Sequence, residues 1–167
     1  MEHDLIEIGH ITDHNRIESI TREIILTLPA WFDAAGQKNY PVENQQKYFL
    51  AATKKGKAIG FIAITDIDST TAEIHCIGIL EDEHGKGIGT KLINAAKAYC
   101  LDGGRDVLLV KTLDASAHYP PYDKTRRFYE SKGFVSRRLI AGFWGAENPC
   151  LEMIWLPGTD SNRRPGD

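Results

Sequence analysis

The sequence predicts a single domain of mixed α and β structure, and three patterns support this fold class. Apolar residues alternate with other residues between positions 72 and 80, as in a strand, and recur at helical spacing between 88 and 101. A glycine-rich turn joins these two segments. The 167 residues, 42% hydrophobic and 26% charged, suit one compact domain with a buried core. We expect residues 1–156 to form this domain and 157–167, which hold no large apolar side chain, to be a disordered tail.

Composition and charge exclude several classes of protein. Twenty Lys and Arg against 23 Asp and Glu give a net charge of −3, so no general attraction to nucleic acid or to an anionic membrane is expected. The chain has no repeat, no signal-peptide pattern and no apolar run of the roughly 18 residues that a membrane span needs. Its three cysteines show no CxxC spacing, which favours reduced core residues over a disulfide scaffold. These features predict a cytoplasmic protein.

The N-terminal elements follow from capping residues and periodicity. Residues 4–11 are predicted to form a short strand. Asp13 is placed to cap a helix that continues to about Leu28, and Pro29 limits that helix. The next segment, residues 30–42, is either a second short helix or a binding loop.

The following segments are mostly β-like. Residues 47–53 and 58–67 are separated by Lys54-Lys55-Gly56-Lys57, and a glycine-containing turn between two such runs predicts a hairpin. The later elements are predicted to be a fully covered strand at 107–110, a helix at 122–131 and strands at about 134–143 and 150–156.

The strand at 72–80 presents two different faces. One face is uniformly small or apolar and consists of Ala72, Ile74, Cys76, Gly78 and Leu80. The other face begins with two ionisable groups and consists of Glu73, His75, Ile77 and Ile79. The amphipathic helix after the glycine turn has its apolar stripe at Ile88, Leu92, Ala96 and Tyr99.

The turn between this strand and this helix has the features of a phosphate-binding loop. The first N–H groups of a helix lack partners inside the helix, and glycines let the backbone approach an anion closely. The patterns of a Walker A loop and of a dinucleotide fingerprint both fail, because Thr90 stands where each needs its last glycine. The pattern [Q/R]-x-x-G-x-G/A fits better, with His84 at the first place and then Gly85-Lys86-Gly87-Ile88-Gly89.

A second motif, Phe128-Tyr129-Glu130-Ser131-Lys132-Gly133-Phe134, lies a helix and a strand further on. With this F-Y-x-x-x-G-F pattern the sequence resembles the GNAT superfamily of acyl-CoA-dependent N-acetyltransferases over nearly the whole chain. The resemblance implies a mixed, mostly antiparallel sheet of about six or seven strands, flanked by about four helices. It also implies transfer of an acetyl group from acetyl-CoA to a primary amine, by direct attack in a ternary complex, without a metal.

The resemblance assigns the cofactor contacts mainly to the backbone. The pantetheine arm would lie along the strand at Ile77, Gly78 and Ile79. The pyrophosphate would receive N–H groups from the turn, at His84, Gly85, Lys86, Gly87, Ile88, Gly89 and Thr90. Three departures from the family pattern stand nearby: His84 replaces the usual Gln or Arg, Glu81-Asp82-Glu83 replaces a Pro-containing turn, and Tyr122 replaces a frequent Asn.

Proton transfer needs a base for the amine and an acid for the departing thiolate. Glu73 and His75 share the pantetheine face of the strand, and we favour Glu73 as the base over His75. Tyr129 matches the family's general-acid tyrosine, and its neighbour Phe128 suits a core position better. Cys76 is a poor nucleophile candidate, because it points to the face opposite Glu73.

The sequence offers several aromatic residues as candidates for the pocket of the acceptor amine. Candidate pocket aromatics, which core packing explains equally well, are Trp31, Phe32, Tyr40, Tyr119 and Trp144. The histidines show no metal-ligand spacing. A small-molecule or protein amine is the expected partner, and the sheet edges would allow a homodimer. The alternatives are a noncatalytic acyl-CoA-binding regulatory module and, without support from the net charge, an acetyltransferase acting on charged tRNA.

Overall fold

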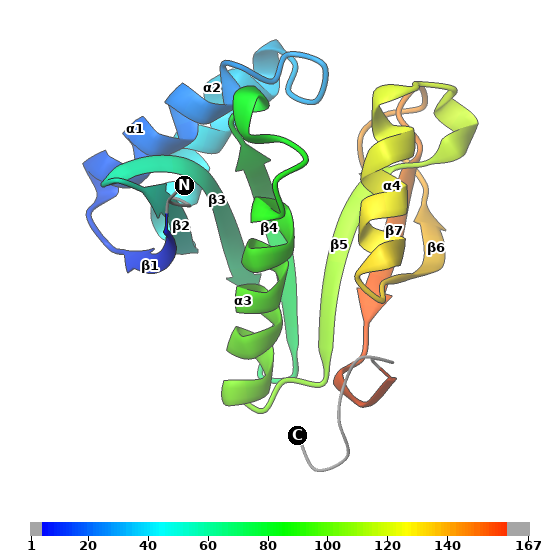
Figure 1. Cartoon of the computed structure of the whole chain (residues 1–167). Helices are drawn as coiled ribbons and strands as arrows, with labels where there is room; N and C mark the ends of the chain where they lie inside the picture. The colour runs from blue at the N-terminus through cyan, green and yellow to red at the C-terminus, as the bar shows by residue number, and fades with distance from the viewer. Residues whose placement is uncertain (1–4, 160–167) are drawn as a thin grey trace. The chain divides into compact units, whose positions relative to one another are not determined.

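The computed structural model describes residues 5–159 of the chain (Figure 1). Within this part the strands are β1 Ile6–Ile11, β2 Tyr48–Lys54, β3 Lys57–Asp66, β4 Thr71–Ile79, β5 Val107–Leu113, β6 Val135–Ile140 and β7 Cys150–Trp155. The α-helices are α1 His14–Ile25, α2 Ala34–Glu43, α3 Ile88–Asp102 and α4 Pro121–Ser131.

The described strands form one sheet in the order β1-β2-β3-β4-β5-β7-β6. The β1–β2, β2–β3, β5–β7 and β6–β7 pairs are antiparallel. The predicted mixed, mostly antiparallel sheet of six or seven strands with about four helices is therefore confirmed.

The chain divides into two compact units. The first contains the residues up to Thr65 together with Ile74–Ala98, and the second contains Asp66–Glu73 and the residues from Tyr99 onward. Strand β4 and helix α3 each contribute residues to both units.

In the first unit, α1 and α2 lie along the face of β1–β3 (Figure 1). The side chain of Asp13 caps α1 as predicted and accepts a hydrogen bond from the Asn15 amide at 3.3 Å. The helix ends at Ile25, about three residues earlier than expected, because the amide of Leu28 bonds the carbonyl of Ile25 in a tighter turn. The buried core that α1 covers includes the stacked rings of Phe49 and Phe61, 5.3 Å apart.

The segment at 30–42 proves to be mainly helical. Helix α2 begins after Asp33, whose side chain accepts a hydrogen bond from the Gly36 amide at 2.9 Å. The predicted hairpin is also present. Lys55 and Gly56 both adopt left-handed backbone conformations, with φ of 52° and 76°, as a tight two-residue turn between antiparallel strands requires.

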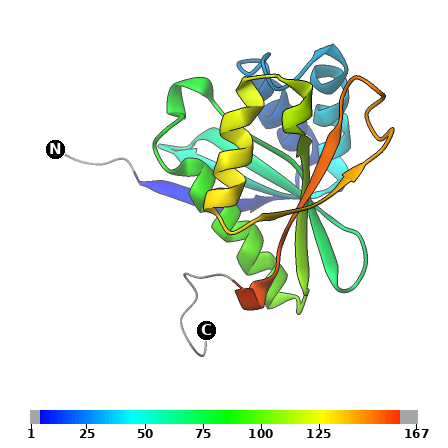
Figure 2. The same ribbon diagram turned by 90° about the vertical axis from the view of Figure 1, so that its right-hand side faces the viewer.

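In the second unit, β5, β7 and β6 lie side by side, and α4 packs against β5 (Figure 2). Helix α4 begins with Pro121 in its first turn, where a missing amide hydrogen costs nothing. Strand β6 ends at Ile140 rather than near 143, since the chain turns there and Gly142 takes a φ of 71°. Of the predicted tail, Pro157–Thr159 form a short 3₁₀ helix, and 160–167 lie outside the described residues.

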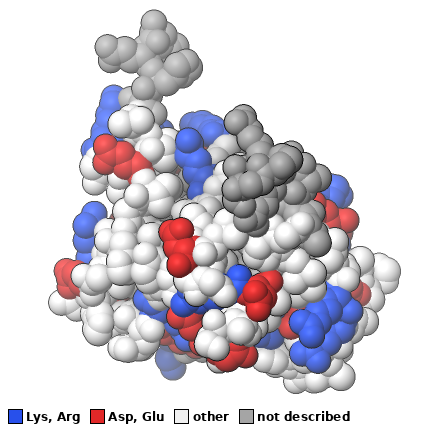
Figure 3. All heavy atoms as spheres, turned by 90° about the horizontal axis from the view of Figure 1, so that it is seen from below, with Lys and Arg blue, Asp and Glu red and all other residues white. Residues whose placement is uncertain are grey.

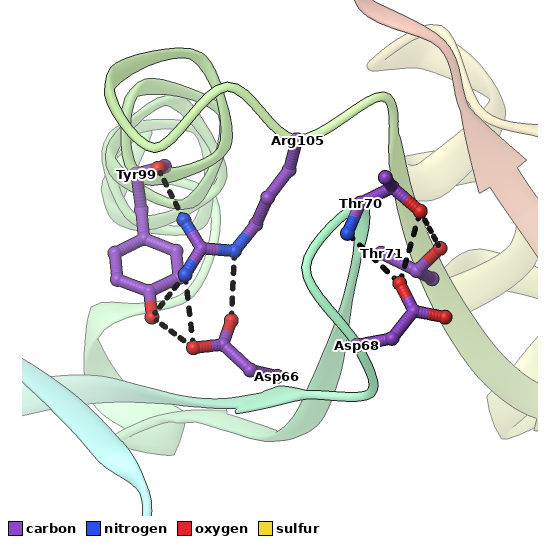
Figure 4. Close-up of polar contacts among 6 residues, drawn as sticks. All are labelled: Asp66, Asp68, Thr70, Thr71, Tyr99 and Arg105. Atoms are coloured by element: carbon purple, nitrogen blue, oxygen red, sulfur yellow. Dashed lines mark hydrogen bonds and ion pairs between the residues drawn. The ribbon is translucent and has the colours of Figure 1, made fainter.

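The α3–β5 connection is joined to the end of β3 by a polar network (Figure 4). Arg105 donates to both carboxylate oxygens of Asp66, at 2.8 and 2.9 Å, and lies over the ring of Tyr99. The Tyr99 hydroxyl donates to the same carboxylate at 2.8 Å. The prediction that Tyr99 belongs to the apolar stripe of α3 is therefore wrong, and Cys100 is the buried residue at this level of the helix.

Candidate active site

The glycine turn begins helix α3 as the sequence predicts. Gly85 and Gly87 have φ of +77° and +82°, and a Cβ added at either position would meet no other atom within 4 Å. Glycine is therefore needed here for backbone conformation rather than for space. Residues 84–87 are exposed, and the first-turn amides of α3 follow directly, so the turn fits an anion such as a pyrophosphate.

The acidic residues before the turn are partly neutralised. Residues Glu81–Glu83 form a short 3₁₀ helix, and Lys54 on β2 donates to both carboxylate oxygens of Glu83 at 2.8 Å. The hydrogen bond from Lys54 lowers the pKa of Glu83, and Lys86 lies 3.4 Å from the same carboxylate. Lys86 is only three residues from Glu83 in the sequence, so a contact between the two is a local one. Lys54 was missed because its partner lies 29 residues away.

The side chain of His84 has a role that the sequence did not suggest. Its Nε2 lies 2.8 Å from the carbonyl oxygen of Ile79, so this nitrogen carries a hydrogen and donates to the last residue of β4. The edge of the imidazole also contacts the ring of Trp31, with centroids 6.0 Å apart. His84 thus ties the turn to the strand that precedes it.

Strand β4 has the two faces predicted from its alternation. Ala72, Ile74, Cys76 and Gly78 are buried, and Glu73, His75, Ile77 and Ile79 are half-buried. Gly78 is a packing requirement, because an added Cβ would lie 2.9 Å from the ring of Phe61. Any residue with a side chain would displace Phe61 here, so the position is limited to glycine.

The two candidate bases have different partners. Glu73, in the second unit, forms an ion pair with Lys111 of β5, and the Lys111 ammonium lies 4.9 Å from the centre of the Phe143 ring. His75, in the first unit, has its Nε2 2.9 Å from a carboxylate oxygen of Glu43 at the end of α2.

Neither Lys111 nor Glu43 was predicted from the sequence as a partner of the candidate bases. A signal for Lys111 existed, because a lysine directly after the apolar run of β5 needs a carboxylate partner when its strand is covered. No comparable signal marks Glu43, which ends a helix whose existence the sequence left open.

Tyr129 belongs to the second unit and is 4% exposed. Its ring packs against those of Phe128 and Phe134, each with centroids 5.6 Å away. Phe128 is only half-buried, so the prediction that Phe128 rather than Tyr129 is the core residue is wrong. The chain reverses after α4, with the Phe134 amide bonded to the Tyr129 carbonyl at 3.0 Å, and this turn brings Phe134 against Tyr129.

The candidate acceptor aromatics divide between the units. Trp31, Phe32 and Tyr40 are half-buried against the first unit's core, and Tyr119 and Trp144 are more exposed in the second. Tyr122, at the start of α4, lies beside Tyr119 with ring centroids 6.0 Å apart.

The three cysteines are free and buried. Desolvation strongly raises the pKa of Cys76, which argues against a nucleophilic role.

Among residues 5–159 no group of three or more His, Cys, Asp or Glu side chains could hold a metal ion. No helix in this same range is both long and apolar enough to span a bilayer.

Surface charge is mixed on the face shown in Figure 3. Lys and Arg side chains are interspersed with Asp and Glu over the part of this face that is not grey.

The chain thus combines a glycine turn, placed between an alternating strand and an amphipathic helix, with a mixed and mostly antiparallel sheet. Residues 45–136 match the model of the acetyltransferase (GNAT) domain. The chain belongs to the GNAT acetyltransferase family.

Individual relatives agree with this assignment. An uncharacterized N-acetyltransferase of Methanocaldococcus jannaschii is 33% identical over an alignment of 103 residues that covers 57% of this chain and 42% of that protein. The chain spans less than half the length of the curated relatives it matches.

Solved structures show the same fold. A structure from Desulfovibrio desulfuricans, titled as a GNAT-family acetyltransferase, has a TM-score of 0.80 at 16% identity, over 92% of this chain and 99% of that one. A GNAT acetyltransferase from Elizabethkingia anophelis with acetyl-CoA bound has a TM-score of 0.71 at 17% identity, over 92% and 99% of the two chains.

Proposed function

We propose that this chain transfers an acetyl group from acetyl-CoA to a primary amine by direct attack in a ternary complex. The observation that carries the proposal is the exposed turn at Gly85 and Gly87, with its left-handed glycines leading into the first turn of α3. Backbone amides from His84 to Thr90 would hold the pyrophosphate. Backbone groups of Ile77–Ile79 would hold the pantetheine arm as an added strand.

The nitrogen of the acceptor ammonium loses two protons in the reaction, and the departing sulfur gains one. The amine nitrogen attacks the thioester carbonyl carbon, the carbon–sulfur bond breaks, and the sulfur leaves as a thiolate. A base, Glu73 or His75, takes the proton of the attacking amine, which near neutral pH is mostly an ammonium. Tyr129 would donate a proton to the thiolate, and the second proton, which the nitrogen loses as the amide forms, would restore the Tyr129 hydroxyl through solvent. This role requires the hydroxyl to be reachable although the ring is buried.

The acceptor class is supported by neighbours of the same fold. Two solved structures at 18% and 15% identity are titled aminoglycoside 6'-N-acetyltransferase and ribosomal-protein-S18-alanine N-acetyltransferase from Escherichia coli. We therefore propose a small-molecule or protein amine, and a first panel of kanamycin, spermidine and a peptide with an N-terminal alanine.

The proposal is tested by isothermal titration with acetyl-CoA. We expect saturable binding by the wild-type chain and a loss of at least about tenfold in affinity for Gly87→Glu, because the carboxylate is placed where the phosphates bind. Gly104→Glu is the matched control, because Gly104 also has a left-handed φ, of 68°, and open space around it. It should bind like the wild type.

Two other outcomes have clear meanings. At roughly 1 mM acetyl-CoA even a weakly binding protein would give a signal. If the wild type shows no binding at this concentration, the cofactor assignment is refuted. Binding without transfer to any amine of the panel would favour the noncatalytic acyl-CoA-binding module instead.

A further inference from the structure

A carboxylate and an imidazole are joined in the first unit where α2 meets β4. The Nε2 of His75 lies 2.9 Å from Oε1 of Glu43. The His75 side chain is 23% exposed and that of Glu43 is 47% exposed, so the pair is open to solvent mainly on the Glu43 side. Neither the family resemblance nor the comparisons assign a role to Glu43.

Helix α2 holds the imidazole through two of its residues. Tyr40 precedes Glu43 by three positions and so lies on the same face of the helix. Its ring meets that of His75 edge-on, with centroids 5.4 Å apart, and Phe32 supports Tyr40 at 5.6 Å. The orientation of the imidazole is thus fixed by a hydrogen bond and by an aromatic contact.

This arrangement has a defined chemical consequence. A carboxylate can only accept a hydrogen bond, so Nε2 of His75 must be the donor and carries the hydrogen. In the neutral ring the lone pair is then on Nδ1. The negative charge of Glu43 also stabilises the imidazolium that forms when Nδ1 takes a proton. A histidine held in this way is better suited to act as a base than one without a carboxylate partner.

Glu73, the alternative base, is paired with a cation rather than with a carboxylate. The carboxylate of Glu73 is already paired with the ammonium of Lys111, which competes with a substrate ammonium for it. His75 is also two residues nearer than Glu73 to Ile77–Ile79 along β4. Both observations reverse the order that the sequence suggested.

We propose that Glu43 is a positioning residue that holds His75 as the base for the acceptor amine. This inference rests on the proposed acetyltransferase function. One proton of the substrate ammonium passes to Nδ1 of His75, the neutral amine attacks the thioester, and His75 later releases the proton to water. Glu43 keeps its charge throughout.

The hydrogen on His75 can be located without any acceptor, by ¹⁵N–¹H spectra of the imidazole rings in the full chain. The His75 signals are assigned by their loss in His75→Gln. In the wild type and in Glu43→Gln, whose amide oxygen still accepts, we expect the hydrogen on Nε2. In Glu43→Ala we expect a mixture of the two tautomers. The same tautomer in all three proteins would overturn the proposal.

Kinetics test the consequence for catalysis, with the three amines of the panel as acceptor probes. We expect kcat to fall at least about tenfold in Glu43→Ala and less in Glu43→Gln, with the KM for acetyl-CoA unchanged. Glu23→Gln, which removes an exposed carboxylate of α1, should leave both constants unchanged. A kcat for Glu43→Ala within about twofold of wild type would overturn the role.

The two proposals fail in different ways. If the wild type does not bind acetyl-CoA, the proposed function is refuted, whereas the spectra still show whether Glu43 sets the tautomer of His75. If the wild type binds acetyl-CoA and transfers to an amine of the panel, but Glu43→Ala keeps the wild-type kcat, the role of Glu43 is refuted while the proposed function stands.

Discussion

Glu83 places a carboxylate shortly before the glycine turn, and Lys54 donates a hydrogen bond to each of its oxygens at 2.8 Å. This contact holds the pKa of Glu83 below its ordinary value, so the residue remains ionised at neutral pH. Its charge would repel a pyrophosphate at the turn if Lys54 did not offset it. Lys54, on the preceding hairpin, would therefore influence the proposed anion site.

We predict that Lys54→Met weakens acetyl-CoA binding by about two- to fivefold, since a surface pair contributes up to about 1 kcal/mol. The double variant Lys54→Met/Glu83→Gln should restore most of the affinity, because it removes both charges. Titration calorimetry at low salt measures the acetyl-CoA affinity of both variants. Lys57→Met, at an exposed position, is the control. Equal weakening in the single and double variants would show that Lys54 acts through something other than Glu83.

At the scale of elements, the Arg105 network joins the start of β5 to the end of β3 through Asp66 (Figure 4). The side chain of Arg105 is 16% exposed and its guanidinium lies over the ring of Tyr99, whereas the side chain of Asp66 is 44% exposed. A bidentate contact of this kind is stronger than a single surface pair, although solvent reaches the carboxylate.

Arg105→Ala should lower the free energy of unfolding by about 1–2 kcal/mol, because it removes the paired hydrogen bonds and the cation–π contact together. Tyr99→Phe should cost less, about 0.5–1 kcal/mol, since only the hydroxyl is lost. Urea unfolding followed by circular dichroism gives both values, and Arg16→Ala on the exposed face of α1 is the control. A loss in Arg105→Ala no larger than that of the control would contradict the stated role of the network.

The elements themselves could be predicted from the sequence because periodicity, caps and glycines are local signals. Asp13, Gly56 and the alternation of β4 each predicted a feature that the structure contains. The charged partners could not be predicted in this way. Glu43 is 32 residues from His75 and Lys111 is 38 residues from Glu73, so only the folded sheet brings each pair together. The roles proposed for Glu73, His75 and Tyr129 stay predictions.

For the whole molecule, the three buried cysteines report separately on the two units. Cys76 belongs to the first unit, and Cys100 and Cys150 belong to the second. Desolvation by burial raises the pKa of Cys100 to about 11, and it raises the pKa of the Cys76 and Cys150 thiols as well. Since the thiolate is the reactive form, all three should be nearly inert in the native protein at neutral pH.

We predict that the three thiols become reactive together, because β4 and α3 run through both units and the loss of either element would open both cores. Pulse labelling with iodoacetamide across a urea gradient, with mass spectrometry of each cysteine peptide, measures the midpoint at every site. Coincident midpoints would show a single cooperative transition. Labelling of Cys100 and Cys150 at lower urea than Cys76 would contradict this, and it would mean that the unit containing Tyr129 opens while the unit containing the glycine turn stays folded.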